Sequence, residues 1–314
     1  MLTEMKYFSP PEEQKEITGQ LKQRKQGHII VSSIEHHAVT ESALWLKNYG
    51  IDVTFAPVDE QGIIKLDKLE KMIRNDTFLI SVMLANNEIG TIQPIENVCE
   101  IAHEYGAKVH SDAVAAFGHI DVDVKKLGVD FLNVSGHKIC GPKGIGFLYV
   151  KGGKPERFMH GGGQENGLRA GTENVAGIAG LATAARIAYE TLSDRARQEK
   201  RIRDYMIKRI LREIPYSRLN GSRECRVTGN MNFSFQYGGM LVVMLNKQGI
   251  CASAGSACTS NSGKPSHVLL ALGLDEKIAE GSLRLTINHT ITHREADYVV
   301  ECIKKDVARL RELA

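Results

Sequence analysis

Short β-rich runs alternate with segments of helical periodicity across the first half of the chain. The runs cover residues 28–33, 52–56, 78–84, 107–111, 129–134 and 145–150, and helical patterns cover 40–49, 66–74 and 95–105. Parallel strands need crossover connections, and helices between successive strands supply them. This alternation therefore predicts an α/β fold in which a mostly parallel sheet carries helices on both faces.

The second half of the chain has a different pattern. Residues 175–214 are rich in Ala, Arg and Glu with apolar residues at helical spacing, which predicts one or two long helices. Strands are predicted at 232–235, near Ile250 and at 282–287, with helices at 239–247 and 294–313. Because 314 residues exceed what one compact core usually holds, we expect two domains. The larger covers 1–195 and begins with a polar helix at 9–27, and the smaller α+β domain covers 196–314.

Composition and charge exclude several classes of function. Hydrophobic residues make up 42% of the chain and charged residues 25%, an ordinary balance for a globular protein. The net charge of +3 is small and spread along the chain, so no nucleic-acid or membrane-surface patch is expected. No apolar run reaches the roughly 18 residues of a membrane span, and the N-terminus lacks a basic-then-apolar signal. We expect a cytoplasmic protein that contacts neither membrane nor nucleic acid.

One of the six cysteines stands apart from the others. Cys258 lies within 254–263, a run of small and polar residues that predicts an exposed, mobile loop rather than core. The cysteines form no Cys-x-x-Cys pair and no zinc-ligand spacing, so most are expected to be buried thiols. Cys251, on a predicted strand, is interpreted as a core residue, and Cys140 as structural.

Polar residues of unusual kinds follow the predicted strands. In open α/β sheets ligands bind beyond the carboxyl ends of the strands, and these positions hold His36, Asn87, Asp112, Ser135, His137 and Lys138. Pyridoxal phosphate (PLP) needs such a set: a lysine amine, a carboxylate facing its pyridine nitrogen, and donors for its phosphate. Taken singly, a lysine after a strand is more often a solvated loop residue, and an aspartate a helix cap. Their occurrence together at successive strand ends favours a cofactor site.

Several strings make this interpretation specific. In chain order they are Glu35-His36-His37, Asn86-Asn87-Glu88-Ile89-Gly90, Ser135-Gly136-His137-Lys138, Arg169-Ala170-Gly171-Thr172 and Gly255-Ser256-Ala257-Cys258-Thr259-Ser260. From about residue 28 to its end, the chain resembles the NifS/IscS-type cysteine desulfurases, which are PLP enzymes of fold type I and are class-V-aminotransferase-like.

The resemblance implies a role for each cofactor-binding residue. Lys138 would bond covalently to PLP, Asp112 would pair with the pyridine nitrogen, and His36 would stack on the ring. Ser135 and His137 would bind the phosphate.

The resemblance also implies a substrate and partners. Asn87 would lie near the cofactor hydroxyl and the substrate, and Arg284 would hold the carboxylate of L-cysteine. Thr172 would reach the phosphate of the other subunit across a homodimer interface. Cys258 would receive the substrate sulfur as a persulfide, releasing L-alanine, and pass it to an iron–sulfur scaffold or another sulfur-acceptor protein. No resident metal is expected, although Cys258 could serve as a transient iron–sulfur ligand.

The chain departs from the family pattern at several positions. The resemblance starts after the family's N-terminal segment, in which a loop at a helix N-terminus binds the cofactor phosphate. We therefore expect a shortened member of the family that binds PLP more weakly. Ala115 stands in place of a usual Gln, Asn166 in place of Arg, and Met240 in place of an acidic residue. These differences leave open a catalytically impaired or non-catalytic relative. Another PLP enzyme such as an aminotransferase is a third alternative, against which the Cys258 loop argues, because transamination uses no mobile thiol.

Overall fold

A computed structural model describes residues 27–152, 155–254 and 265–313. Apart from Gly27, the helix predicted over 9–27 lies outside these residues, and so does Cys258.

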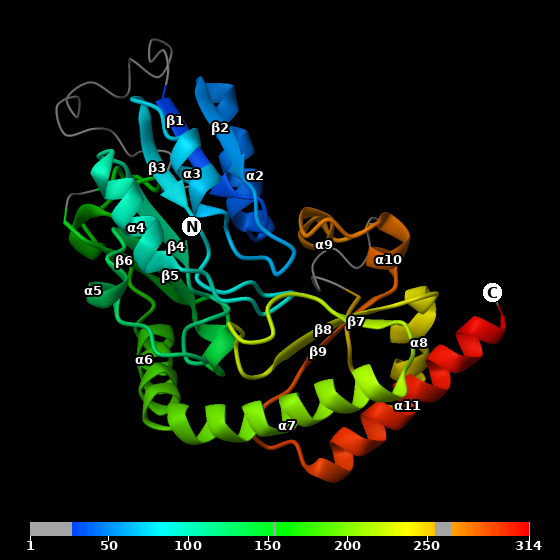
Figure 1. The fold of residues 1–314 in the computed structure, drawn as a ribbon. Helices are drawn as coiled ribbons and strands as arrows, with labels where there is room; N and C mark the ends of the chain where they lie inside the picture. Colours follow the sequence, from blue (N-terminus) through cyan, green and yellow to red (C-terminus); the bar gives the residue numbers. More distant parts are fainter. Residues whose placement is uncertain (1–26, 153–154, 255–264, 314) are drawn as a thin grey trace.

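The first half of the chain folds around one six-stranded sheet (Figure 1). Its strands are β1 (Gly27–Ser32), β2 (Ile51–Ala56), β3 (Thr77–Ser81), β4 (Lys108–Asp112), β5 (Phe131–Ser135) and β6 (Gly146–Val150). Their order is β2-β1-β3-β4-β5-β6, and every pair is parallel except β5 with β6. The predicted fold class is therefore confirmed.

Alternate side chains of the strands pack on opposite faces of this sheet. Ile30 and Ile80 belong to the core under α3 (Leu66–Met72) and α4 (Ile95–Glu104). Their neighbours Ile29 and Leu79 pack on the other face against α2 (His37–Leu46). Two further short helices, η3 (Lys47–Tyr49) and α5 (Val124–Leu127), lie in the connections. Because both faces are covered, apolar side chains lie on both sides of the parallel strands, as in a buried sheet.

The second half of the chain builds a smaller antiparallel sheet. Its order is β7 (Ser217–Leu219), β8 (Asn230–Phe235), β9 (Ser282–Thr286). Phe233 and Leu283 are fully buried beneath α7 (Leu192–Glu213), α8 (Leu241–Lys247) and α11 (His293–Glu312). Thr292 and Glu295 form a capping box that begins α11.

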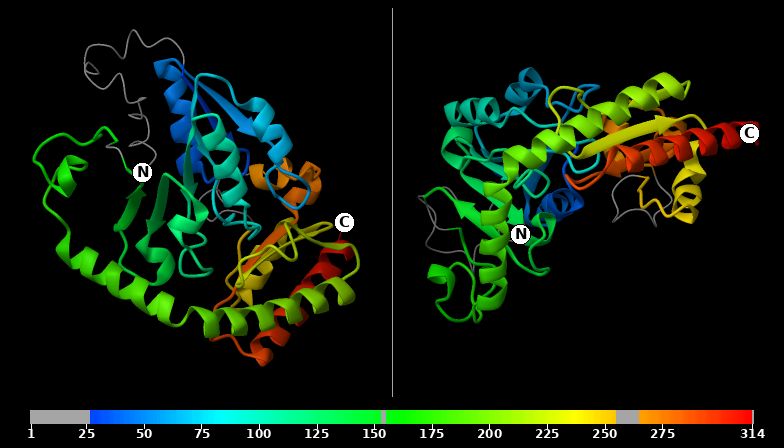
Figure 2. Two further views of the ribbon diagram at one scale, coloured as in Figure 1. Left: turned by 60° about the vertical axis from the view of Figure 1, so that its left-hand side comes forward. Right: turned by 90° about the horizontal axis from the view of Figure 1, so that it is seen from below.

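A pair of consecutive helices joins the two sheets. The helix α6 (Val175–Glu190) packs against the turn after β5, and α7 follows after Thr191. As Figures 1 and 2 show, α7 runs along one side of the molecule from the first sheet to the second. The predicted domain boundary at residues 195 and 196 falls inside this helix and stays a prediction.

The structure differs from the predicted elements in the second half. The strand predicted near Ile250 does not form, because Gly249 turns the chain with a φ of 77° and only Ser253 then makes a single bridge, to Arg284. Ile250 is buried individually against the smaller core. The three-residue strand β7 and the five-residue helices α9 (His267–Ala271) and α10 (Glu276–Glu280) are too short for periodicity to indicate them.

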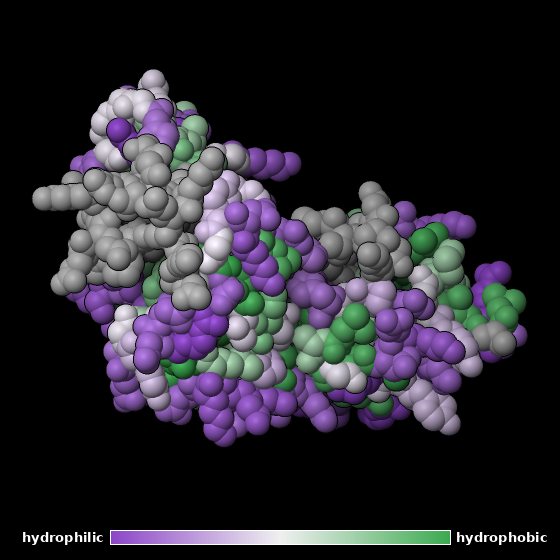
Figure 3. Space-filling view, turned by 90° about the horizontal axis from the view of Figure 1, so that it is seen from above, coloured by the Kyte–Doolittle hydropathy of each residue, from purple (hydrophilic) through white to green (hydrophobic). Residues whose placement is uncertain are grey.

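In the parts of the chain that the structure describes, no helix is both long enough and apolar enough to cross a membrane. The face in Figure 3 carries many hydrophilic residues along its outline.

Candidate active site

Three of the predicted cofactor residues lie at the carboxyl ends of neighbouring parallel strands. Asp112 is the last residue of β4 and is buried. His36 follows β1 as the N-cap of α2, where its Nδ1 accepts a hydrogen bond from the Ala38 amide at 3.1 Å. Lys138 lies after β5 in the short helix η4 (Gly136–Ile139) and is exposed. Since β1, β3, β4 and β5 are adjacent and parallel, their carboxyl ends share one edge of the sheet.

Charges from different strand ends act together on His36. Burial lowers the pKa of this half-buried imidazole below its usual range, the positive charge of Lys138 lowers it further, and the negative charges of Asp112 and Glu88 oppose the shift. The amine, the acid and the imidazole therefore lie within electrostatic range of one another. A neutral imidazole is suited to stacking on an aromatic ring.

A buried chain of hydrogen bonds holds Asp112 from below. Ser81 Oγ contacts His110 Nδ1 at 2.8 Å, His110 Nε2 contacts Asn133 Oδ1 at 2.6 Å, and Asn133 Nδ2 donates to Asp112 Oδ1 at 2.9 Å. Because Asn133 Oδ1 can only accept, His110 Nε2 carries the proton, and burial lowers the pKa of His110 so that the ring stays neutral. The Val114 amide donates to Asp112 Oδ1 at 2.9 Å as well. These donors stabilise a carboxylate at this position.

The turn after β5 presents exposed polar side chains on a tightly packed base. Ser135 Oγ and His137 Nδ1 are 2.8 Å apart, and His137 is exposed beside Lys138. A side chain at Gly141 would meet the Gly136 carbonyl oxygen at 2.9 Å, so the turn closes only with glycine there. The backbone thus fixes the base of Lys138 while leaving the side chains accessible.

The smaller sheet contributes Arg284 to the same region. Arg284 lies on β9 and donates from Nη1 to the Asn87 carbonyl oxygen at 3.3 Å. Its backbone pairs with Ser253, with Arg284 N to Ser253 O at 2.6 Å. The two predicted substrate residues are thus brought together although they are far apart in the sequence.

The segment that contains Cys258, residues 255–264, lies outside the described residues, but its two flanks do not. On one flank Ser282 Oγ of β9 donates to the Ala254 carbonyl oxygen at 2.6 Å. On the other, Ser266 Oγ donates to Glu88 Oε2 at 2.5 Å. Next to Ser266, His267 Nε2 contacts the Glu35 carbonyl oxygen at 3.0 Å. Both flanks therefore contact the elements that carry the predicted site residues.

The remaining cysteines do not follow the sequence-based expectation. Of the five described, Cys99 and Cys302 are buried, whereas Cys140, Cys225 and Cys251 are exposed. The interpretation of Cys251 as core is wrong, because the turn at Gly249 replaces the predicted strand. Burial raises the pKa of the Cys99 thiol to about 12, which makes it a poor nucleophile.

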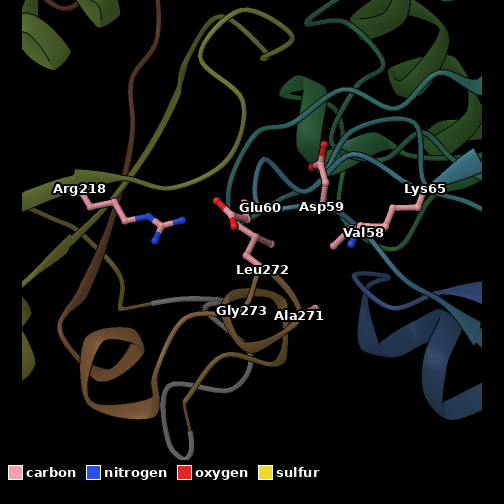
Figure 4. A pocket seen from close by; sticks show the side chains of 8 residues that line it. All are labelled: Val58, Asp59, Glu60, Lys65, Arg218, Ala271, Leu272 and Gly273. Carbon is pink, nitrogen blue, oxygen red and sulfur yellow. The ribbon is translucent and has the colours of Figure 1, made fainter.

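Thr172 and the pocket of Figure 4 are separate from this cluster. Thr172 is exposed in the segment before α6, and no hydrogen bond joins it to the cluster within the described part of the chain. The pocket in Figure 4 has a volume of about 300 Å³ and shares no lining residue with the cluster. It is lined by Val58, Asp59, Glu60, Lys65, Arg218, Ala271, Leu272 and Gly273. The described residues contain no group of three or more His, Cys, Asp or Glu placed to hold a metal.

Sequence reasoning missed three residues of the site. Glu35 and Glu88 were visible inside the quoted strings, but no pattern indicated that their side chains turn inward, where they are almost fully buried. Asn133 lies two residues before Ser135 on β5, so strand alternation places both on one face. That alternation was the one available signal for Asn133.

The fold and the site together define a class of protein, an α/β enzyme with a lysine, an acid and an imidazole at adjacent strand ends. The family model Aminotransferase class-V matches residues 16–299, and the chain belongs to this family. "Cysteine desulfurase IscS" of Methanosarcina thermophila is 48% identical over 290 residues, covering 91% of this chain and 72% of the relative. "Cysteine desulfurase IscS 1" of Archaeoglobus fulgidus is 44% identical over 294 residues, covering 93% and 76%. A solved "NIFS-LIKE PROTEIN" has a TM-score of 0.83 at 38% identity, covering 93% of this chain and 77% of that one.

These similarities confirm the predicted family and cofactor. Class-V aminotransferases and IscS/NifS proteins are PLP-dependent enzymes. The residues present fit PLP, because the site offers an accessible amine on Lys138, a buried acid with fixed donors on Asp112 and a neutral imidazole on His36.

Proposed function

We propose that this chain is a PLP-dependent cysteine desulfurase, which converts L-cysteine to L-alanine and leaves the sulfur as a persulfide on Cys258. The observation that carries the proposal is that both flanks of the Cys258 segment attach at the site, Ala254 to β9 beside Arg284 and Ser266 to Glu88. The similarity to proteins named cysteine desulfurase supports it.

The residues at the strand ends would hold the cofactor. When bound, PLP supplies an electron sink that stabilises negative charge on the substrate carbon. Lys138 would hold it covalently and, once substrate displaces the amine, would move a proton. Asp112 would keep the pyridine nitrogen protonated, and His36 would cover the ring. Ser135 and His137 would donate to the phosphate.

The remaining residues would act on L-cysteine. Arg284 would meet both oxygens of the substrate carboxylate with its planar guanidinium, beside Asn87. The Cys258 thiolate would attack the substrate sulfur, so that the carbon–sulfur bond breaks as the sulfur–sulfur bond forms. L-cysteine and the Cys258 thiol thereby give L-alanine and a persulfide; one thiol hydrogen ends on the alanine methyl group and the other on the persulfide.

The length of chain between Cys258 and its flank suits this step. Cys258 is the fourth residue after Ala254, and a chain spans at most about 3.6 Å per residue, so the Cα atom of Cys258 is tethered within roughly 14 Å of that of Ala254. That reach includes the neighbourhood of Arg284, whose backbone pairs with Ser253.

The cofactor part of the proposal is tested by colour. The purified protein supplied with PLP is expected to be yellow, and Lys138→Ala should remove this visible absorbance. Borohydride should bleach the wild type and leave the cofactor covalently attached to it, and it should attach no cofactor to Lys138→Ala. Lys143→Ala, an exposed lysine five residues later, is the matched control and should stay yellow. A wild-type protein that remains colourless with excess PLP would instead support the non-catalytic relative.

The sulfur part is tested with L-cysteine and a reducing agent. Sulfide and alanine should be released together, and Cys258→Ser should abolish sulfide release while the protein stays yellow. Cys251→Ser, an exposed thiol seven residues earlier, should retain the activity. Turnover that does not depend on Cys258 would favour a different PLP reaction, such as transamination.

We also propose a homodimer in which Thr172 reaches the partner's phosphate site. Two apolar side chains shortly after Thr172 are exposed in the single chain, Val175 at 72% and Ile178 at 41%. Such exposure is typical of an interface. Val175→Glu is expected to shift the mass measured by light scattering from dimer to monomer, and an unchanged dimer would contradict this interface.

Cytoplasmic location and delivery of sulfur to an iron–sulfur scaffold or another acceptor stay predictions. Delivery is supported by the sequence around Cys258, because its run of small and polar residues is of a kind that predicts a mobile segment. Transfer of radiolabelled sulfur from the Cys258 persulfide to an added scaffold protein is the measurement that checks the acceptor.

A further inference from the structure

The carboxyl group of Glu35 is buried in the fold. It precedes His36 in the turn between β1 and α2, and its exposed fraction is 0%. Its Oε1 accepts a hydrogen bond from the Met83 amide, just after β3, at 2.5 Å. The Glu35 carbonyl oxygen accepts from His267 at the start of α9. One residue thus ties the turn that carries His36 to two other elements.

The second oxygen of this carboxyl group is unpaired. Glu35 Oε2 is buried and has no hydrogen-bond partner among the described residues. An ionised carboxylate with a bare oxygen in a protein interior is far more costly than a neutral carboxylic acid, because charge loses more than a dipole does when water is removed.

A second carboxyl group, that of Asp112, affects the protonation of Glu35. Burial and the nearby negative charge of Asp112 both raise the pKa of Glu35 well above its usual range, and the Met83 amide opposes them. Among the described residues, the side chain of Asp112 accepts from two donors, Asn133 and Val114, whereas the side chain of Glu35 accepts from one. When two carboxyl groups are close, the group with fewer donors takes the proton.

We propose that Glu35 is a positioning residue that carries a proton in the folded protein, fixing the His36 turn to the end of β3 without adding a second negative charge beside Asp112. The charged and titratable groups placed against it are Asp112 from β4 and His267 from α9, and His36 is its neighbour in the sequence. The inference rests on and deepens the proposed function, because it explains how a second buried carboxyl group can lie near Asp112 at the cofactor site without adding a charge.

The proton is detected directly by infrared spectroscopy of the protein without cofactor. At pH 7 the wild type should show the carbonyl band of a protonated carboxylic acid, which shifts in heavy water and is missing from Glu35→Gln. Glu60→Gln, at an exposed glutamate, is the control and should keep the band. A wild type without the band, or a band that Glu35→Gln leaves unchanged, would overturn the proposal. The wild-type titration is informative even if the variant fails to fold.

Stability against pH gives a second measurement with a definite sign. The folded protein keeps the Glu35 proton while the unfolded chain loses it above the ordinary pKa of 4.5. The ratio of folded to unfolded wild type, divided by the same ratio for Glu35→Gln, should therefore fall as pH rises, by about tenfold per pH unit up to the pKa of the folded state. Equal slopes between pH 5 and 7 would contradict a neutral Glu35.

The positioning role is tested by rescue. Glu35→Ala should weaken PLP binding by about tenfold or more, because it removes the partner of the Met83 amide. Glu35→Gln should restore most of the affinity, since its amide oxygen can accept the same hydrogen bond. Equal losses in both variants would show that the charge itself is needed. The infrared and stability results do not depend on turnover, so they stand or fall separately from the desulfurase proposal.

Discussion

Two glutamates in this molecule occupy opposite environments. Glu35 is buried at the strand ends and has one amide donor, and burial together with the charge of Asp112 raises its pKa. Glu213 lies near the end of α7, where Arg209 donates to both of its oxygens at 2.8 Å and lowers its pKa to about 2. The same side chain is therefore expected to be neutral in one region and ionised over nearly the whole pH range in the other.

The difference shows how each region uses polar groups. The site is held by uncharged donors in a buried chain from Ser81 to Asp112, where an unpaired group is costly. The crossing of α7 and α11 is held by Arg209, which also contacts Asp297 at 2.7 Å and Glu301 at 2.5 Å on α11. Water reaches this crossing, so each of its ion pairs contributes little alone.

Removing one link of the buried chain should have the largest effect. Asn133→Leu takes the acceptor from His110 Nε2 and a donor from Asp112, so we expect a loss of about 2 kcal/mol in the free energy of unfolding. Trp45, the single tryptophan, packs on the same sheet at α2 and reports unfolding in urea by fluorescence. Asn133→Asp is the matched variant of similar size. A loss below about 0.5 kcal/mol in Asn133→Leu would mean that the chain does not hold this region together.

Removing Glu213, whose side chain is 15% exposed, should cost less and should depend on pH. Glu213→Gln breaks the paired contact with Arg209, and we expect a loss of roughly 1 kcal/mol at pH 7 because solvent screens the network. The folded-state pKa of Glu213 is depressed, so its contribution is present above its ordinary value of 4.5 and disappears as pH falls toward about 2. Glu35→Gln should show the opposite dependence. If the stability differences between wild type and each of the two variants changed with pH in the same direction, the two glutamates would not differ in protonation as expected.

Much of the sheet could be predicted from the sequence, because the strands of the first half and the three longer helices between them have their own periodicity, whereas the four-residue helix α5 was not predicted. Asp112 and Lys138 were found because the carboxyl ends of parallel strands must meet at one edge. The loss of the strand near Ile250 was not predictable, since one glycine with a positive φ decides it. The inward turn of Glu35 and the contact of Ser266 with Glu88 depend on pairing between distant segments, which periodicity does not encode.

The smallest expected effect is a difference between the two regions in how their contribution to stability depends on salt. At 1 M ionic strength the Debye length is about 3 Å, so interactions between exposed charges are strongly screened. The stability difference between wild type and Glu213→Gln should therefore shrink by a few tenths of a kcal/mol from low to high salt. The difference between wild type and Asn133→Leu should stay constant, because Ser81, His110 and Asn133 are uncharged and the chain that they form is buried away from water and ions. A salt dependence of equal size in both variants would show that solvent and ions reach the chain beneath Asp112, and the neutral, buried character assigned to that region would then be wrong.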